Sequence, residues 1–227
     1  MAQKKNIAVV LSGCGVYDGS EICEAVITML HISKQKAEYQ CLAPNIPQRE
    51  VINHLVGGRC EGEVRNVLVE AARIARGKIK DLAHANPADY DAAIFPGGYG
   101  AAKNLSNFAS MGTKFELHPD VQKFILTMNS LGKPLGFICI SPALAAKALG
   151  HLNPLLTIGN DTTTASALHE LGATHIQTTA DEICVDEKNR IVSTPAFMIE
   201  NTTLAEISSG IEKLVKTVLK LTTKATE

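Results

Sequence analysis

Alternation of short β-branched runs with amphipathic helical segments is the feature that most constrains this chain. The run "NIAVVLSG" at residues 6–13 is a strand pattern ended by glycine, and residues 20–35 then repeat apolar side chains at the three-four spacing of a helix. The pattern returns with strands at 37–44, 90–98 and 133–140 and helices at 61–77, 121–132 and 141–150. Such alternation predicts an α/β fold with a parallel sheet covered by helices on both faces.

The last third of the chain has a different rhythm. Residues 183–194, "ICVDEKNRIVST", place two β-rich runs around a polar turn and predict a hairpin. The C-terminal segment carries Ile207, Ile211, Leu214 and Val218 on one stripe, which predicts an amphipathic helix that covers the core. The 227 residues, 45% of them hydrophobic, fit one domain over residues 1–227.

Charge and composition narrow the class of partner. The formal net charge is -1, so the sequence shows no electrostatic footprint for nucleic acid or for a membrane surface. No apolar run approaches the roughly 20 residues that a membrane-spanning helix needs. The six cysteines have irregular spacing and no CxxC pair, which indicates free thiols. We therefore expect a soluble cytoplasmic protein with a small-molecule partner.

Three loops are expected to meet at one edge of the sheet. They are "SGCGVYDGSE" after the first strand, "PGGYGAAKN" after the strand that ends at Phe95, and "CISPA" after the strand that ends near Cys139. In doubly wound sheets, functional loops gather at the carboxyl ends of the strands, next to the point where the strand order reverses. This edge is the predicted functional site.

Cys139 is the candidate nucleophile. Ser141 and Pro142 suit the cap and the first turn of the following helix, which would place the thiol at a helix N-terminus. Unpaired N–H groups and the helix dipole there favour the thiolate and lower the pKa of the thiol. The strand-turn-helix placement is that of a nucleophile elbow. A buried packing role is the alternative, because cysteine is among the most often buried residue types.

The glycine pair Gly97 and Gly98 supplies candidate hydrogen-bond donors, because glycine lets backbone N–H groups approach a ligand closely. With the N–H of Ile140, the Gly98 N–H is predicted to form an oxyanion hole. A tight turn is the alternative reading of this pair. Lys103 and Asn104 follow it and are weaker candidates for contact with a substrate.

Glu21 is the candidate proton acceptor and donor, because it lies in the first turn of the helix after the first loop. An acidic residue there also serves as an ordinary helix cap. Asp18 and Glu24 compete with Glu21 for the catalytic role, with Glu24 nearly one turn further along the helix.

Two other kinds of site are disfavoured. The glycines at 13, 15 and 19 give GxGxxxG instead of GxGxxG, and the next strand has no acidic residue at its end to hold a ribose. No histidine has metal-ligand spacing with another histidine or with a cysteine. We therefore expect no cofactor and no metal, and Cys14 is at most a secondary reactive thiol.

Five segments closely resemble the ElbB branch of the PfpI-like superfamily: "LSGCGVYDGSE", "RNVLVEAARIARG", "PGGYGAAKNLSNFA", "GFICISPAL" and "STPAFM". The resemblance runs from about residue 6 to about residue 219. It implies a flavodoxin-like αβα sandwich of the class I glutamine amidotransferase type, usually dimeric. By motif, the family's cysteine is Cys139, its glutamate is Glu21, and its oxyanion donors are Gly98 and Ile140.

Three departures from the superfamily limit the chemistry. Peptidase and chaperone relatives have a histidine directly after the cysteine, where this chain has Ile140. The late His-x-Glu motif of true amidotransferases is also absent from the residues after 193. Where glyoxalase-type relatives have a histidine, this chain offers "NDTTT", so Asn160 or Asp161 takes that place.

The resulting functional prediction is a cofactor-independent glyoxalase of the lyase class that converts glyoxal or methylglyoxal to glycolate or lactate. Cys139 would form a hemithioacetal and Glu21 would shuttle a proton through an enediol. Apparent deglycase activity on glycated amines would be the same chemistry. The alternative is a redox or carbonyl-stress sensor with an oxidisable Cys139. A role in isoprenoid metabolism ranks last, because no DDxxD element is present.

Overall fold

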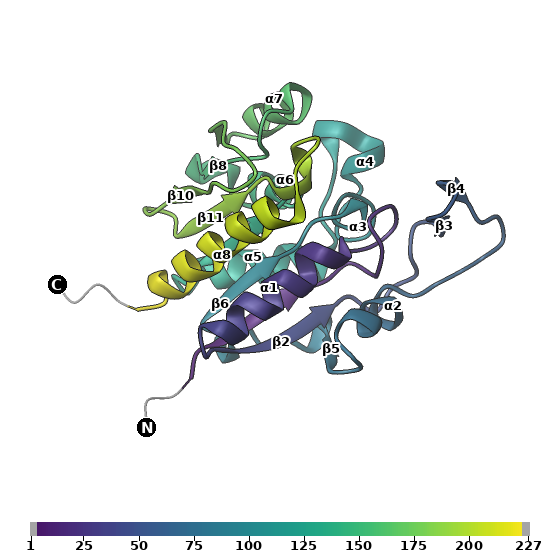
Figure 1. Cartoon of the computed structure of the whole chain (residues 1–227), viewed down its shortest axis with the longest axis horizontal. Helices are drawn as coiled ribbons and strands as arrows, with labels where there is room; N and C mark the ends of the chain where they lie inside the picture. Colours follow the sequence, from purple (N-terminus) through teal and green to yellow (C-terminus); the bar gives the residue numbers. More distant parts are fainter. Residues whose placement is uncertain (1–3, 224–227) are drawn as a thin grey trace.

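The computed structural model describes residues 4–223, and its centre is a seven-stranded sheet (Figure 1). The strand order is β10-β11-β7-β6-β1-β2-β5, and every pair is parallel except β10 with β11. The strands are β1 (Asn6–Val10), β2 (Glu38–Ala43), β5 (Ile79–Asp81), β6 (Ala92–Phe95), β7 (Leu135–Ile138), β10 (Cys184–Asp186) and β11 (Ile191–Thr194). The predicted parallel α/β fold is confirmed, as is the hairpin at residues 183–194.

Helices cover both faces of this sheet and enclose two cores. One face packs against α1 (Ile22–Lys34), α2 (Val67–Ile74) and α8 (Leu204–Leu221), and α1 and α8 lie side by side in Figure 1. The other face packs against α5 (Pro119–Ser130), α6 (Pro142–Leu149) and α7 (Thr162–Glu170). Strands β6 and β7 are buried along their whole length because both of their faces are covered.

Smaller elements lie outside these layers. Strands β3 (Ile52–Asn53) and β4 (Gly58–Arg59) form an arm that projects from the body in Figure 1, and β8 (Leu155–Leu156) pairs with β9 (Thr174–His175). The short helices are α3 (Tyr99–Lys103) and α4 (Phe108–Met111). Single 3₁₀ turns lie at Leu82–His84, Pro87–Asp89, Gly112–Lys114, Gly150–Leu152 and Ala196–Met198.

One predicted helix is shorter than its sequence pattern. Residues 61–77 were expected to be helical, but α2 begins only at Val67, because the Asn66 side chain caps it by accepting from the Val69 N–H at 3.1 Å. Gly77 follows the helix end with a positive φ of 77°. The sequence pattern therefore predicted the end of this helix more accurately than its start.

The strand order brings the three predicted loops together. Strands β7, β6 and β1 are consecutive neighbours in the sheet, and their carboxyl ends lead to Cys139, Gly97 and the loop at residues 11–21. The order reverses between β1 and β6, which is where a doubly wound sheet binds its ligand.

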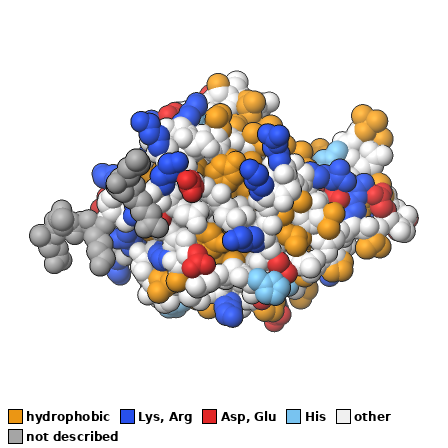
Figure 2. Space-filling view, turned by 90° about the horizontal axis from the view of Figure 1, so that it is seen from below, with side chains coloured by type: hydrophobic (Ala, Val, Ile, Leu, Met, Phe, Trp, Pro, Cys, Tyr) orange, Lys and Arg blue, Asp and Glu red, His pale blue; other side chains and the backbone are white. Residues whose placement is uncertain are grey.

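The surface of the protein mixes charge signs. On the face shown in Figure 2, basic, acidic and hydrophobic side chains are interspersed. Among the helices that the structure describes, none combines the length and the apolar character that crossing a bilayer requires.

Candidate active site

Cys139 lies in a strained turn between β7 and α6. Its φ is +62°, a left-handed conformation that costs a non-glycine residue free energy and that concentrates at functional sites. Its N–H donates to the Thr194 carbonyl at 3.0 Å, which anchors the turn to β11. The residue is 8% exposed and lines a cavity. The structure therefore has the strand-turn-helix geometry of a nucleophile elbow, as predicted.

Ser141 holds the elbow in place without capping the helix. Ser141 stands at the N-cap position of α6, as predicted, but its side chain makes no capping hydrogen bond there. Its hydroxyl instead accepts from the Ile138 N–H at 2.8 Å and donates to the Phe95 carbonyl at 2.7 Å. Because Phe95 ends β6, this hydroxyl joins the elbow to the strand that carries the glycine pair.

The glycine pair approaches the Cys139 sulfur closely. The N–H groups of Gly98 and Ile140 both face the sulfur and favour its ionised form. Gly98 has a φ of +90°, and an added Cβ would lie 2.4 Å from both the Gly19 carbonyl oxygen and the Glu21 nitrogen. Only glycine fits there, so the predicted oxyanion donors do meet at the candidate nucleophile.

Glu24, rather than Glu21, is the carboxyl group beside the sulfur. Glu24 is fully buried, and its Oε2 accepts from the Gly97 N–H at 2.8 Å. A Cβ added to Gly97 would lie 2.4 Å from the Cys139 Cβ and 2.9 Å from this Oε2. The Cys139 and Glu24 side chains therefore both lie against the Gly97 backbone, close to each other. The expected contact between Glu21 and the thiol is thus replaced by one from Glu24.

Glu21 has a different position. It is the N-cap of α1, and its Oε2 accepts from the Glu24 N–H at 2.6 Å. It also lines the cavity. Because Glu21 caps the helix, α1 begins at Ile22. Glu24 is then the third residue of the helix, and its side chain points inward.

Burial shifts the pKa values of the Cys139 and Glu24 pair upward. Desolvation, followed by the Glu21 charge, raises the pKa of Glu24 to about 8. Desolvation, followed by the Glu24 charge, raises the pKa of the Cys139 thiol well above its ordinary value, although the N–H groups of Gly98 and Ile140 oppose this rise. The predicted lowering of the thiol pKa is therefore wrong, because burial outweighs the nearby amides. The pair holds its protons at neutral pH and loses the first of them near pH 8.

The cavity in front of the sulfur has a volume of about 330 Å³ and is mainly apolar. The charged groups among its lining residues are Glu21 and Asp161, both acidic. Asp161 caps α7, its Oδ1 accepting from the Thr164 N–H at 2.6 Å. The lining residues are Val16, Glu21, Gly98, Tyr99, Ala102, Phe108, Ala109, Cys139, Ile140, Asp161, Thr164, Phe197 and Met198.

Lys103 and Asn104 do not line this cavity, contrary to their predicted contact with substrate. Lys103 forms an ion pair with Glu50 and donates to the Tyr17 carbonyl at 3.0 Å. Asn104 is buried and donates to the carbonyls of Ser12 and Asp18 at 2.9 and 2.8 Å. Both side chains therefore hold the first loop in place instead of facing a ligand.

No histidine is among the residues that line the cavity. Of Asn160 and Asp161, the two candidates for the position of the superfamily histidine, only Asp161 lines it. Within residues 4–223, no three His, Cys, Asp or Glu side chains gather in a way that could hold a metal ion. Cys14 lies outside the cavity, and burial raises the pKa of its thiol.

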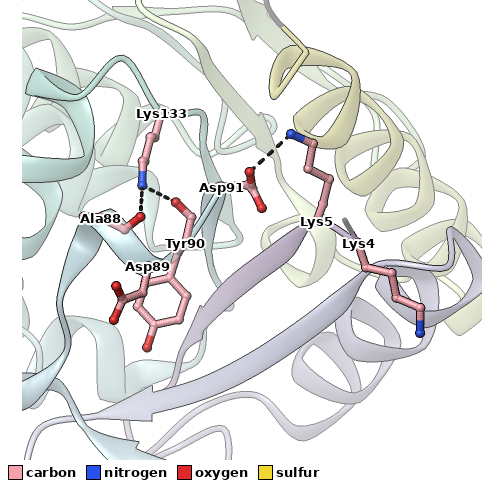
Figure 3. A pocket seen from close by; sticks show the side chains of 7 residues that line it. All are labelled: Lys4, Lys5, Ala88, Asp89, Tyr90, Asp91 and Lys133. Carbon is pink, nitrogen blue, oxygen red and sulfur yellow. Dashed lines mark hydrogen bonds and ion pairs between the residues drawn. The ribbon is translucent and has the colours of Figure 1, made fainter. Parts of the chain in front are cut away.

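A second cavity, of about 410 Å³, lies at the opposite edge of the sheet, where β1, β6 and β7 begin (Figure 3). Its charged groups are largely satisfied within the protein. The Lys133 ammonium donates to the carbonyls of Pro87, Ala88 and Tyr90, and Lys5 pairs with Asp91 at 3.2 Å. These contacts give this cavity a structural role.

Curated proteins similar to this chain share most of its length. It is 49% identical to the human (Homo sapiens) "glutamine amidotransferase-like class 1 domain-containing protein 3, mitochondrial", with 96% of this chain and 84% of that protein covered. It is 46% identical to the rat (Rattus norvegicus) "ES1 protein homolog, mitochondrial", with 97% and 85% covered. A scan against protein-family models finds no match.

Solved structures agree with this relationship. An isoprenoid biosynthesis protein with an amidotransferase-like domain from Ehrlichia chaffeensis is 35% identical and has a TM-score of 0.88, with 95% of this chain and 99% of that one covered. A ThiJ/PfpI domain protein from Brachyspira murdochii is 13% identical with a TM-score of 0.59, covering 96% and 97%, and shows the shared fold alone.

The expected cytoplasmic location is contradicted by these relatives. The human and rat proteins, and an ES1 protein from zebrafish (Danio rerio) that is 36% identical, are all named as mitochondrial. The sequence-based expectation rested on the lack of a long apolar run and on the pattern of free cysteines, and neither feature identifies a compartment.

Proposed function

The chain belongs to the ES1-like branch of the class I glutamine amidotransferase-like proteins, and from this premise we propose that it is a cofactor-independent glyoxalase acting on small neutral dicarbonyls. The observation that carries the proposal is that Cys139 lines a small, mainly apolar cavity and that the buried Glu24 carboxyl group lies beside the Cys139 thiol. A thiol, a proton-transferring carboxyl group and two N–H donors are the groups that this reaction needs.

In the first step the Cys139 sulfur bonds to an aldehyde carbon of glyoxal. In the form of the pair that has lost its first proton, the Glu24 carboxylate accepts the thiol proton and passes it to the aldehyde oxygen, giving a hemithioacetal. The developing negative charge on that oxygen is stabilised by the N–H groups of Gly98 and Ile140, which already face the sulfur. A base with a pKa near the working pH suits this transfer, and Glu24 has a pKa of about 8.

In the second step Glu24 moves a proton between the two carbons. It removes the C–H proton of the hemithioacetal to give an enediolate, and it returns the proton to the adjacent carbon to give a thioester. Water then hydrolyses the thioester, the C–S bond breaks, and the thiol regains its proton. The balance is glyoxal plus water to glycolate plus one proton, and methylglyoxal would give lactate by the same steps.

The missing histidine is compatible with this chemistry. A carboxyl group that is already in place beside the sulfur performs every proton transfer in the scheme, so no imidazole is required. The cavity also offers no lysine or arginine among its lining residues to bind an acidic substrate. Both features favour a neutral dicarbonyl over a peptide, a glutamine or a diphosphate.

The test is turnover of glyoxal by the purified protein without added thiol. Cys139→Ala should abolish glycolate formation, because no other described cysteine lines the cavity. Cys184→Ala is the matched control, since Cys184 is a buried free cysteine in β10 and should leave turnover intact. Full activity of Cys139→Ala would overturn the proposal.

A redox sensor is the second candidate, and one observation favours it. A protonated Glu24 beside Cys139 would hydrogen-bond to a sulfinate and stabilise it without any turnover. Mass spectrometry after mild peroxide separates the two proposals. Oxidation confined to Cys139, together with negligible loss of glyoxal, would favour the sensor.

A further inference from the structure

Three buried polar side chains follow one face of α1. Glu24, Thr28 and His31 are 0%, 0% and 2% exposed. Their spacing of four and then three residues places them within about 60° of one another around the helix and spreads them over about 10 Å along it. This polar row begins at the candidate catalytic carboxyl group.

Each member of the row has a polar atom without a partner. Among the side chains and backbone of residues 4–223, nothing hydrogen-bonds to Glu24 Oε1, Thr28 Oγ1 or His31 Nδ1. An unpaired buried polar atom destabilises the folded state, because it has given up its hydrogen bonds to water without gaining others. Internal water is the ordinary way in which proteins satisfy such atoms, and all three lie on one face of α1.

The row ends at the contact between α1 and α8, near the surface. α1 and α8 form an extensive helix–helix contact. The other ring nitrogen of His31, Nε2, lies 3.0 Å from the Ser208 hydroxyl of α8, and Ser208 is half-buried. The charged groups that act on His31 are Glu212 and Lys216 from α8 and Lys34 from α1. One end of the row is therefore at the active site and the other is close to solvent.

We propose that internal water fills this row and that Thr28 and His31 carry protons between Glu24 and the surface at Ser208. The proposal rests on the proposed glyoxalase function, in which each turnover releases one proton beside a buried carboxyl group. While product still fills the cavity, the proton cannot leave through it, and the row provides another path to solvent. Glu24 would pass it through water held by Thr28 to His31 Nδ1, and His31 would release the proton on Nε2 toward Ser208.

A crystal structure of the free protein tests the water directly. We expect ordered water within hydrogen-bond distance of Thr28 Oγ1 and of at least one of Glu24 Oε1 and His31 Nδ1. In Thr28→Val, which keeps the shape and removes the hydroxyl, that water should be lost. Dry packing of Thr28 in the wild-type protein would overturn the proposal, whatever the protein does with glyoxal.

Kinetics test the proton transfer. Thr28→Val should lower kcat for glyoxal by about tenfold, leave KM unchanged and raise the solvent deuterium isotope effect on kcat. Thr28→Ser should restore both values. The control is Ser33→Ala, which removes an exposed hydroxyl from the same helix. A Thr28→Val variant with wild-type kcat and isotope effect would contradict the proton role. If the wild-type protein does not turn over glyoxal, the proposed function fails, and with it the proton role, while the crystallographic result still decides the water row.

Discussion

Glu24 is the residue that determines the chemistry of this site. Its carboxyl group has lost solvent contact, lies beside the sulfur and has its pKa raised to about 8, mainly by burial. Glu21, three residues earlier, caps the helix with one carboxyl oxygen, which accepts from the Glu24 N–H. The two residues have the same side chain, so their different roles follow from position alone.

Burial of Glu24 predicts a dependence of stability on pH. The folded-state pKa of about 8 lies above the ordinary value of 4.5, so the protein takes up a proton on folding at any pH between these two values. The free energy of unfolding therefore decreases by up to about 5 kcal/mol as the pH rises from 4.5 to 8. Below pH 4.5 burial of Glu24 does not reduce the free energy of unfolding, and above pH 8 the reduction has reached its full size. Urea unfolding at a series of pH values measures this.

The control for this stability prediction is Glu24→Gln, in which the loss of stability between pH 4.5 and 8 should shrink to the part that comes from Glu21, whose pKa burial also raises. Parallel stability curves for the two proteins over that range would show that Glu24 is not the group responsible.

At the residue scale, the sequence was sufficient for Cys139 and insufficient for its partner. A cysteine between a buried strand and a Ser-Pro helix start predicts a strand-turn-helix elbow, and the structure has this geometry. The choice among Glu21, Glu24 and Asp18 depends on the rotation of α1 about its axis against the sheet, which tertiary packing sets and the local sequence pattern does not. Lys103 and Asn104 were misassigned because their partners, among them Glu50 and Ser12, are distant in sequence.

At the element scale, the outward face of α1 is the feature with an open role. Ile22, Val26 and Leu30 are 44%, 46% and 47% exposed and are spaced four residues apart, so they form one apolar stripe. The resemblance to ElbB proteins implies a homodimer. We propose that this stripe packs against the same stripe of a second copy, as a two-fold interface requires.

The dimer prediction is measured by light scattering during size-exclusion chromatography. The wild-type protein should have twice the mass of the chain, and Val26→Lys, which places a charge in the centre of the stripe, should have the mass of one chain. Lys123→Ala, at an exposed position of α5 on the opposite face of the sheet, is the control and should remain a dimer. A monomeric wild-type protein would contradict the prediction.

The elements themselves were predictable to different degrees. Strands β1, β6 and β7 are short apolar runs bounded by turn residues, and the sequence locates them well. The arm of β3 and β4 escaped prediction, because two-residue strands carry no periodicity. The start of α2 depends on one Asn66 hydrogen bond, which a helical pattern extending further upstream conceals.

At the scale of the whole molecule, the strand order explains why the site exists. The loops after β1, β6 and β7 meet because these strands are neighbours, and the reversal of order between β1 and β6 opens a space above them. The alternation of strands and helices predicted this arrangement. The electrostatic character of the cavity was not predictable, since its walls come from segments as distant as Val16 and Met198.

That electrostatic character predicts selectivity among substrates. Glu21 and Asp161 are the charged residues of the cavity wall, so an anionic aldehyde meets like charge on entry. Mesoxalate semialdehyde, in which a carboxylate replaces the methyl group of methylglyoxal, should have a kcat/KM at least about tenfold below that of methylglyoxal. Asp161→Asn should narrow this gap by improving the anionic compound alone. Equal kcat/KM values for the two compounds in the wild-type protein would show that the wall charges do not select.

The most direct test of the account is the pH dependence of kcat/KM for glyoxal in the wild-type protein, Glu24→Gln and Glu21→Gln. The wild-type value should rise with pH and level off above about 8, as the Cys139 and Glu24 pair loses its first proton. Glu24→Gln should lose at least about 100-fold and lack this rise, whereas Glu21→Gln should keep the rise and lose less than about tenfold. A Glu24→Gln enzyme with wild-type kcat/KM and pH profile would contradict the assignment of proton transfer to Glu24.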